Sequence, residues 1–494
     1  MKSDEKPDVL ERDSPSPDLD PERGADIEPV EEKASPEVAN LMDLDKGLVG
    51  WDSEDDDENP QYLPLPPKPL ASSMVAPGTA LTMASLHEPS AVIGSFSVTI
   101  FVLGYAVGPL FLGPLSEMYG RYIVVCASTA VFDAFLLGSA LAPNMPGLIV
   151  MRFLAGIGGS GVMTIAPAIV ADMYPIERRA FTMSLIIMAQ SAGPALGPIC
   201  GGFIAEGLGW RWAYWILLMA AGATTVFLLL FMPESYAPIV LARKAARLRK
   251  ETGREDLQTR LARADNQSTL LRTSIVRPLK LLTKSPIAIM ICGYIATVYG
   301  FLYLMFTTIP DVFRGSYGWS TSITGLAYTG LCIGMLVALA VIMCTSDAAA
   351  MRLTRANGGK FEPEFRMPHS FYYATLLPVS LLWYGWTAEK GVHWISPIIG
   401  MSLFGAGMLG LFMASQLYLV DAYPLYAASA AATVRTALSI IGAFLPLAGP
   451  PLYSALGVGK GNTVLAGISV AMLPIPILLY RYGKGIRERW PVEL

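Results

Sequence analysis

Eleven long apolar segments fill the chain between Ala91 and Tyr480, with short polar connections between them. Each segment is about 18 to 27 residues long, which is enough for a helix to cross a hydrocarbon core about 30 Å thick. A water-soluble fold could not bury so many apolar helices. The sequence therefore predicts an all-α polytopic membrane protein. The predicted spans are 91–114, 122–142, 147–171, 180–205, 210–232, 285–309, 322–345, 368–388, 394–420, 427–451 and 462–481.

Positive charges lie on alternate connections between these spans and so orient the chain. Basic residues in short loops mark the cytoplasmic side of a membrane protein. They occur at Arg121, at Arg178 and Arg179, throughout 233–284, and at Arg352, Arg355, Lys360 and Arg366. Five clear spans precede the long basic loop and six follow it. We predict an N-terminal helix bundle (62–232) and a C-terminal helix bundle (285–481), joined by a basic cytoplasmic loop (233–284). A short cytoplasmic tail (482–494) follows the second bundle.

The first span of the N-terminal bundle is the weakest. Two matched bundles require a twelfth span, and residues 62–85 are the only candidate upstream of Ala91. Lys68 and several prolines interrupt this stretch, and prolines break helices while charges are costly in lipid. We therefore predict a degenerate, truncated first span.

Residues 1–61 form a strongly acidic N-terminal tail. The first 60 residues carry 21 acidic and 6 basic groups, a balance of about −15, whereas the remaining 19 acidic and 30 basic groups give the rest of the chain about +11. The tail is rich in Pro, Ser, Asp and Glu and is expected to be disordered. It is cytoplasmic if the first span crosses the membrane, and outside the cell if it does not.

The sequence argues against enzymes and against transport driven by ATP. No GxxxxGK[ST] phosphate loop is present, and the three histidines, His87, His369 and His393, fall on different connections. The five cysteines lie inside or at the ends of apolar segments, as small packing residues do. We expect no cofactor, no metal site and no nucleic-acid partner.

The connection after the first clear span carries the string GPLSEMYGRY, from Gly113 to Tyr122. It resembles the loop motif of the major facilitator superfamily, in which an acid and a base flanking a tight glycine turn latch two bundles together. The resemblance implies this role for Glu117 and Arg121. Gly113 would allow close packing and Gly120 a sharp reversal of the chain. The alternative is a solvated turn with one chance ion pair.

A second motif is SAGPALGPICGGF, which repeats glycine at four-residue spacing. Residues at this spacing share one helix face and let another helix approach closely, while the prolines can bend the segment. The pattern is similar to the GP-rich motif of proton-coupled drug antiporters. The alternative is a purely structural glycine face. The motif residues are Gly193, Pro194, Gly197, Pro198, Gly201 and Gly202.

A few polar residues lie at membrane depth, where charges usually serve function. Arg152 precedes a glycine-rich run, and the family resemblance assigns it to proton coupling or substrate orientation; the alternative is that it snorkels to the outer surface. Asp133 is the candidate proton carrier, since burial favours the protonated form of a carboxyl group. Arg435 also lies at this depth. Tyr299 and Gln416 are candidates for substrate contact, with ordinary packing as the alternative.

Longer strings, among them VGWDSEDDDENP, MPESYAP and YLVDAYPLYAASA, extend the resemblance over residues 48 to 494 and are similar to fungal members of the drug:proton antiporter branch of the superfamily. The resemblance implies a proton-coupled exporter of small organic molecules that works by alternating access in the bilayer as a monomer. Alternatives are a polyamine or nutrient transporter, or an inactive member with a damaged first helix. The plasma membrane is the expected location, and a vacuolar membrane the alternative.

Overall fold

The computed structural model describes residues 48–49, 74–173, 193, 196–254, 256–259, 267–360, 362–423 and 427–490. These residues form helices almost throughout, as the apolar segments predict. The helices are α1 (Thr79–Ser85), α2 (Ala91–Tyr119), α3 (Arg121–Ala140), α4 (Met145–Met173), α6 (Trp210–Phe231), α7 (Ala237–Thr252), α8 (Gln267–Lys284), α9 (Pro286–Tyr317), α10 (Thr321–Thr324), α11 (Thr329–Ala356), α12 (Met367–Glu389), α13 (Ile395–Ala422), α14 (Ala427–Phe444), α15 (Gly449–Leu456), α16 (Val458–Met472) and α17 (Pro474–Arg489).

The predicted fold class, an all-α polytopic membrane protein, is confirmed. Within the described part of the chain, nine helices or helix pairs are long and apolar enough to cross a membrane. The 23-residue helix α12 coincides with the predicted span 368–388. The predicted span 180–205 lies mostly outside the described residues.

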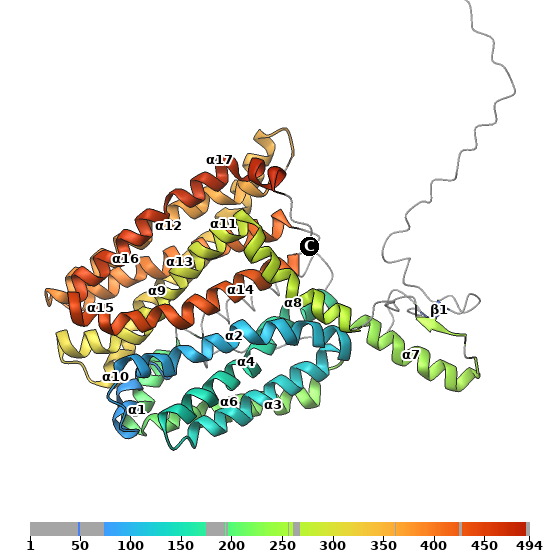
Figure 1. Ribbon diagram of the computed structural model, residues 1–494, viewed down its shortest axis with the longest axis horizontal. Coiled ribbons are helices and arrows are strands. Elements are labelled where there is room, and N and C mark those ends of the chain that lie inside the picture. The colour runs from blue at the N-terminus through green and yellow to red at the C-terminus, as the bar shows by residue number, and fades with distance from the viewer. Residues whose placement is uncertain are drawn as a thin grey trace, which may run out of the picture.

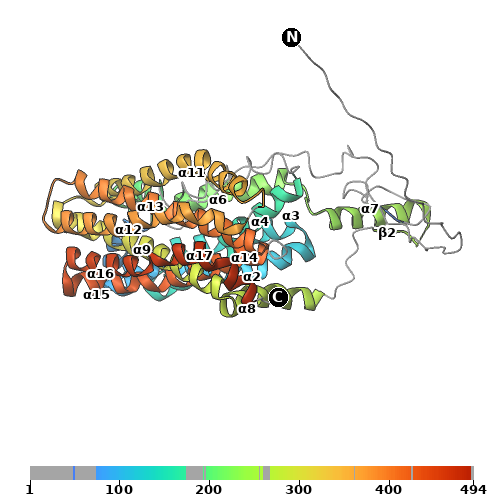
Figure 2. The same cartoon turned by 90° about the horizontal axis from the view of Figure 1, so that it is seen from above.

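The helices form two groups that lie side by side (Figure 1). The N-terminal group contains α1 to α4 and α6, and the C-terminal group contains α9 to α17. Helix α7 projects from one end of the molecule, and α1 and α10 lie at the other end, an arrangement that Figure 2 also shows for α7. Because α7 belongs to the basic loop, its end of the molecule is the predicted cytoplasmic side.

The two groups meet along α2 and α14. The hydroxyl of Thr99 on α2 donates a hydrogen bond to the Ala443 carbonyl on α14 at 2.8 Å. The rings of Phe96 and Phe444 stack nearby, with centroids 6.5 Å apart. These contacts lie toward the end where α1 and α10 are found, so they hold the outer halves of the bundles together.

The described part of the predicted first span lies at this outer end. Met74 and Val75 are buried with Trp210 of α6, and α1 has only seven residues. At 1.5 Å per residue, α1 is about 10 Å long and does not cross a bilayer by itself. Residues 62–73 of the predicted span lie outside the described residues.

One short stretch of the acidic tail differs from the predicted disorder. Leu48–Val49 forms strand β1, which pairs in parallel with strand β2 (Gln258–Thr259) of the basic loop. Val49 is of a residue type that favours strands, and Leu257, which directly precedes β2, is buried with Ala245 of α7. Strand β1 therefore lies at the predicted cytoplasmic end and Met74 at the opposite end, and the cytoplasmic location of the tail stays a prediction.

Candidate functional site

Polar side chains from three helices meet near the middle of the molecule, between the two bundles. Tyr105 comes from α2, Tyr299 and Tyr303 from α9, and Arg435 from α14. The Tyr299 and Tyr303 rings lie 5.1 Å apart. Arg435 is close enough to Tyr299 and Tyr105 to interact electrostatically with both. We call these four residues the central cluster.

Arg435 is the only member of the central cluster with a formal charge. Its guanidinium makes neither a hydrogen bond nor an ion pair with any residue that the structure describes, and its side chain keeps some accessible surface. An arginine at the centre of a membrane helix costs about 2.5 to 3.5 kcal/mol on insertion scales. This cost is not offset by a partner within the described protein, so Arg435 points to a ligand or to water.

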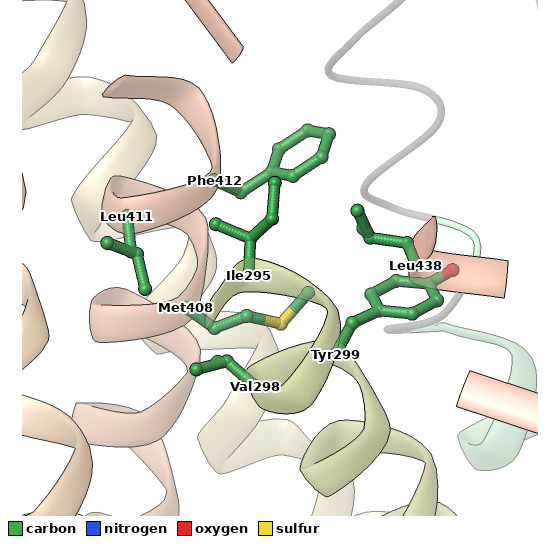
Figure 3. Close-up of a pocket in the computed structure, with 7 residues that line it drawn as sticks. All are labelled: Ile295, Val298, Tyr299, Met408, Leu411, Phe412 and Leu438. Carbon is green, nitrogen blue, oxygen red and sulfur yellow. The ribbon is translucent and has the colours of Figure 1, made fainter. Parts of the chain in front are cut away.

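A small apolar pocket adjoins the central cluster (Figure 3). Tyr299 belongs to both, and Leu438 lies one helical turn beyond Arg435 on α14. Figure 3 shows α9, α13 and α14 directing these side chains toward one another. The lining residues are Ile295, Val298, Tyr299, Met408, Leu411, Phe412 and Leu438. The centre therefore combines one cation, phenol groups and an apolar wall.

The second predicted contact residue, Gln416, lies one turn from Phe412 on α13 and so shares its helix face. Its side-chain oxygen is buried and accepts no hydrogen bond from the described residues. Tyr299 lines the pocket, and Gln416 continues the same face toward the cytoplasm. The structure brings the two residues to one region, and their contact with substrate stays a prediction.

Arg152 lies in the interior of the N-terminal bundle and does not snorkel. Its side chain donates hydrogen bonds to the Tyr214 hydroxyl and to the Val98 carbonyl, both at 3.1 Å, and the residue is 2% exposed. The guanidinium also stands over the Phe101 ring, 5.5 Å from its centroid. Arg152 thus ties α4 to α2 and α6, next to the central cluster on the N-terminal side.

Asp133 lies between α3 and α6. Its carboxylate accepts a hydrogen bond of 2.6 Å from the Thr225 hydroxyl, and the side chain is half-buried. The structure therefore does not place Asp133 in the central cluster. Its role as a proton carrier stays a prediction, and any coupling to the centre would have to pass through the N-terminal bundle.

Arg121 of the loop motif forms an ion pair within the N-terminal bundle, and the latch role of Glu117 and Arg121 stays a prediction. Arg121 pairs with Asp172 on α4 at 3.0 Å. It also donates to the Ser116 hydroxyl at 2.6 Å and stands over the Tyr236 ring at 4.6 Å. Arg121 begins α3 and points across to the end of α4. In this structure Arg121 therefore holds the N-terminal bundle together internally.

The two motif glycines have different surroundings. Gly120 has a φ of +102°, as expected for a sharp reversal, and the Glu234 carboxylate packs against it. Glu234 accepts hydrogen bonds from the backbone of Arg121 and Tyr122 at 2.8 and 3.3 Å, which caps α3. A Cβ at Gly113 would meet only the Thr164 methyl group at 3.8 Å, so close packing does not require glycine there.

The GP-rich motif lies at the outer end, where the bundles touch. A side chain at Gly201 would collide with the Met74 carbonyl, and one at Gly202 would come within 2.8 Å of the Thr321 carbonyl in the C-terminal bundle. Gly193, Gly197 and Pro198 are buried as well. Pro194 lies outside the described residues. Gly202 thus allows the backbones of the two bundles to approach each other closely.

The Glu206 carboxylate also joins the two bundles at this end of the molecule. Glu206 accepts a hydrogen bond from the backbone N–H of Ser322, at the start of α10. This hydrogen bond lowers the pKa of Glu206. The outer ends of the two bundles are therefore joined both by glycine packing and by a charged hydrogen bond, which we call the outer contact.

The C-terminal bundle repeats the ion pair of the N-terminal bundle. Arg366, before α12, pairs with Asp421 at the end of α13 at 3.2 Å. The two pairs have similar sequence separations, 51 residues for Arg121 with Asp172 and 55 for Arg366 with Asp421. Neither Asp172 nor Asp421 was predicted from the sequence as a partner of an arginine. The nearly equal spacing of the basic and acidic residues in the two halves could have indicated both pairs.

Comparison with known proteins gives a consistent result. A family model described as Major Facilitator Superfamily matches residues 69–446. The MFS transporter cpaT of Aspergillus oryzae is 40% identical over 453 residues, 89% of this chain and 91% of the relative. The Efflux pump radE of Floropilus chiversii is 39% identical over 467 residues, 91% of this chain and 87% of the relative. The partially occluded inward-open structure of the xylose transporter XylE from E. coli has a TM-score of 0.62 at 16% identity, and the match covers 84% of this chain and 94% of XylE.

Proposed function

This chain belongs to the major facilitator superfamily, and from that premise we propose that it exports small organic molecules in exchange for protons. The observation that carries the proposal is the central cluster between two bundles that touch at their outer ends. There Arg435, which has no hydrogen-bond or ion-pair partner among the described residues, lies with tyrosines beside an apolar pocket. A relative of 39% identity is named an efflux pump. Rocking of the two bundles about this centre would expose it alternately to each side of the membrane.

Protons can supply the energy. Each charge that moves down a membrane potential of 100 mV releases about 2.3 kcal/mol, and each pH unit adds about 1.4 kcal/mol. In this proposal Asp133 takes up a proton from outside and releases it to the cytoplasm. The hydrogen bond from Thr225 and the contact between α3 and α6 link its protonation to the packing of the N-terminal bundle.

The polyamine alternative fits the centre poorly. A polycation needs carboxylates to replace its hydration, and the central cluster contains a cation and phenols instead.

The protein would act as a monomer in the plasma membrane, since each chain carries both bundles and exporters of this kind act at the cell boundary. The alternative of an inactive transporter with a damaged first helix is tested by the transport assay described next.

The test is transport into sealed proteoliposomes with an acidic lumen, which should drive cargo inward through molecules whose cytoplasmic face is outside. We expect Asp133→Asn to abolish the acceleration by the pH gradient while leaving binding of cargo intact. Asp256→Asn, in the exposed Arg254–Asp256 pair of the cytoplasmic loop, is the matched control and should behave as wild type. Unchanged pH dependence in Asp133→Asn would exclude Asp133 as the proton carrier.

A further inference from the structure

We propose that the cargo is an organic anion with an aromatic or aliphatic body, whose charged group is held by Arg435 and whose body packs against the apolar residues that line the pocket of Figure 3. The empty volume of this pocket is about 180 Å³ in the present conformation, and the pocket must widen to admit a ring system. The inference rests on the proposed function, because it assumes that cargo passes through the central cluster. Beyond export itself, the inference names the chemical class of the substrate and the residue that selects this class.

The charge at the centre favours an anion. Arg435 lacks a hydrogen-bond or ion-pair partner among the described residues. Arg152 adds a second positive charge on the N-terminal side, close enough to Tyr105 to interact with it electrostatically. Tyr105 therefore interacts electrostatically with both arginines, and the central cluster contributes no carboxylate. The two arginines would repel a cationic cargo, whereas an anion would neutralise a charge that is costly to bury.

The geometry of the donors fits an oxyanion. A guanidinium presents its N–H groups in a planar fork that matches the oxygens of a carboxylate or sulfonate. Tyr105 and Tyr299 lie beside Arg435, and a phenol hydroxyl can donate a further hydrogen bond to the same anion. Three donors from α2, α9 and α14 therefore converge from both bundles. An anion bound there would contact both halves of the transporter.

The apolar wall adjoins this anion position directly. Arg435 and Leu438 are separated by one turn of α14 and so face the same side. Tyr299 lines the pocket together with Met408 and Phe412, and Figure 3 shows its hydroxyl pointing away from those two side chains. A cargo with one charged end and one apolar body would satisfy both parts of the site. The inside-negative potential of a cell also favours outward movement of such an anion.

The experiment compares two probes that share a ring system and carry permanent charges of opposite sign, 2-naphthalenesulfonate and 2-naphthyltrimethylammonium. Uptake into proteoliposomes is measured by mass spectrometry of the lumen contents. We expect the wild-type protein to transport the sulfonate at least about tenfold faster than the ammonium, since like charge excludes the cation. Arg435→Gln should reduce sulfonate transport at least about tenfold, and Arg435→Lys should retain part of it.

The controls separate site chemistry from folding. Arg355→Gln removes one positive charge from an exposed position on α11 and should transport the sulfonate normally. Tyr299→Phe keeps the ring, removes only the hydroxyl, and should weaken sulfonate transport severalfold. Circular dichroism and thermal unfolding verify that each variant is folded before transport is compared.

Two results would overturn the inference while leaving the exporter proposal in place: preference for the ammonium probe, or sulfonate transport that Arg435→Gln does not change in the folded protein. Transport of neither probe by folded wild-type protein would contradict both the inference and the proposed function.

Discussion

Arg121 holds the cytoplasmic end of the N-terminal bundle through an ion pair, a hydrogen bond and a cation–π contact. Its side chain is 9% exposed and that of its partner Asp172 is 22% exposed, so neither charge is well hydrated. Charged hydrogen bonds of this kind contribute more than surface pairs because water screens them less.

We expect Arg121→Gln to lower the free energy of unfolding by about 1 to 3 kcal/mol, because Asp172 would keep its charge in a half-buried position without its partner. Thermal unfolding in detergent measures this loss. Arg254→Gln is the matched control, since the Arg254–Asp256 pair is 44% and 59% exposed and should contribute about 0 to 1 kcal/mol. Equal effects of the two substitutions would refute the structural role of Arg121.

The sequence predicts the location of a single residue where that location depends only on its depth in an apolar segment. Arg152 was expected at membrane depth, and it is buried there. Partners were not predictable, because the pairing of Arg121 with Asp172 depends on where α3 begins relative to the end of α4. The surroundings of Arg435, which pairs with no residue in the described part of the chain, depend in the same way on three helices that are far apart in sequence.

At the scale of elements, glycines set the contact between α2 and α4. A Cβ at Gly104 would lie 2.6 Å from backbone atoms of Phe153, Gly156 and Ile157. Backbone atoms cannot move aside as a flexible side chain can. The helices can therefore approach this closely only because Gly104 has no side chain.

We expect Gly104→Ala to separate α2 from α4 and to lower stability by about 1 to 3 kcal/mol, the range for overpacking in a close-packed core. Gly113→Ala is the matched control on the same helix, because a Cβ there meets only Thr164 at 3.8 Å. Thermal unfolding of the two variants in parallel gives the comparison. A larger loss in Gly113→Ala would contradict the packing that the structure shows.

Apolar periodicity predicted most of the helices, but it did not predict those outside the membrane. The basic loop contains α7 and α8, and Leu241 and Ala245 of α7 are buried at four-residue spacing. This spacing was a usable signal that the high charge of the loop obscured. The predicted first span shows the opposite limit. The composition of residues 62–85 indicates weak helix formation, but it does not fix where α1 begins.

At the scale of the whole molecule, the outer contact holds the bundles closed on one side. The Ser322 backbone hydrogen bond lowers the pKa of Glu206 when the contact is made. The closed form therefore binds a proton less tightly than a form in which the contact is broken. Stabilisation by Glu206 is complete above its ordinary pKa and is lost as the pH falls through the lowered pKa.

We expect acidification of the outer side to pH values below this lowered pKa to shift the protein toward an outward-open form. Spin labels at Leu208→Cys and Ile323→Cys, both exposed positions on opposite sides of the contact, should report a longer distance at acidic pH. The labels are introduced into a protein without reactive native cysteines. Glu206→Gln keeps an acceptor oxygen and should remove the pH response, whereas Glu206→Ala should lengthen the distance at neutral pH. An identical pH response in Glu206→Gln would exclude Glu206 as its source.

The central claim is that two bundles carry an organic cargo past a shared polar centre in exchange for protons. Its most direct test records cargo uptake and lumen pH in the same sealed proteoliposomes, loaded with an acidic lumen and supplied with an amphiphilic aromatic cargo. We predict that cargo enters faster as the lumen becomes more acidic and that each uptake phase raises the lumen pH. Uptake that continues unchanged after an ionophore abolishes the pH gradient, with no proton movement, would contradict the claim.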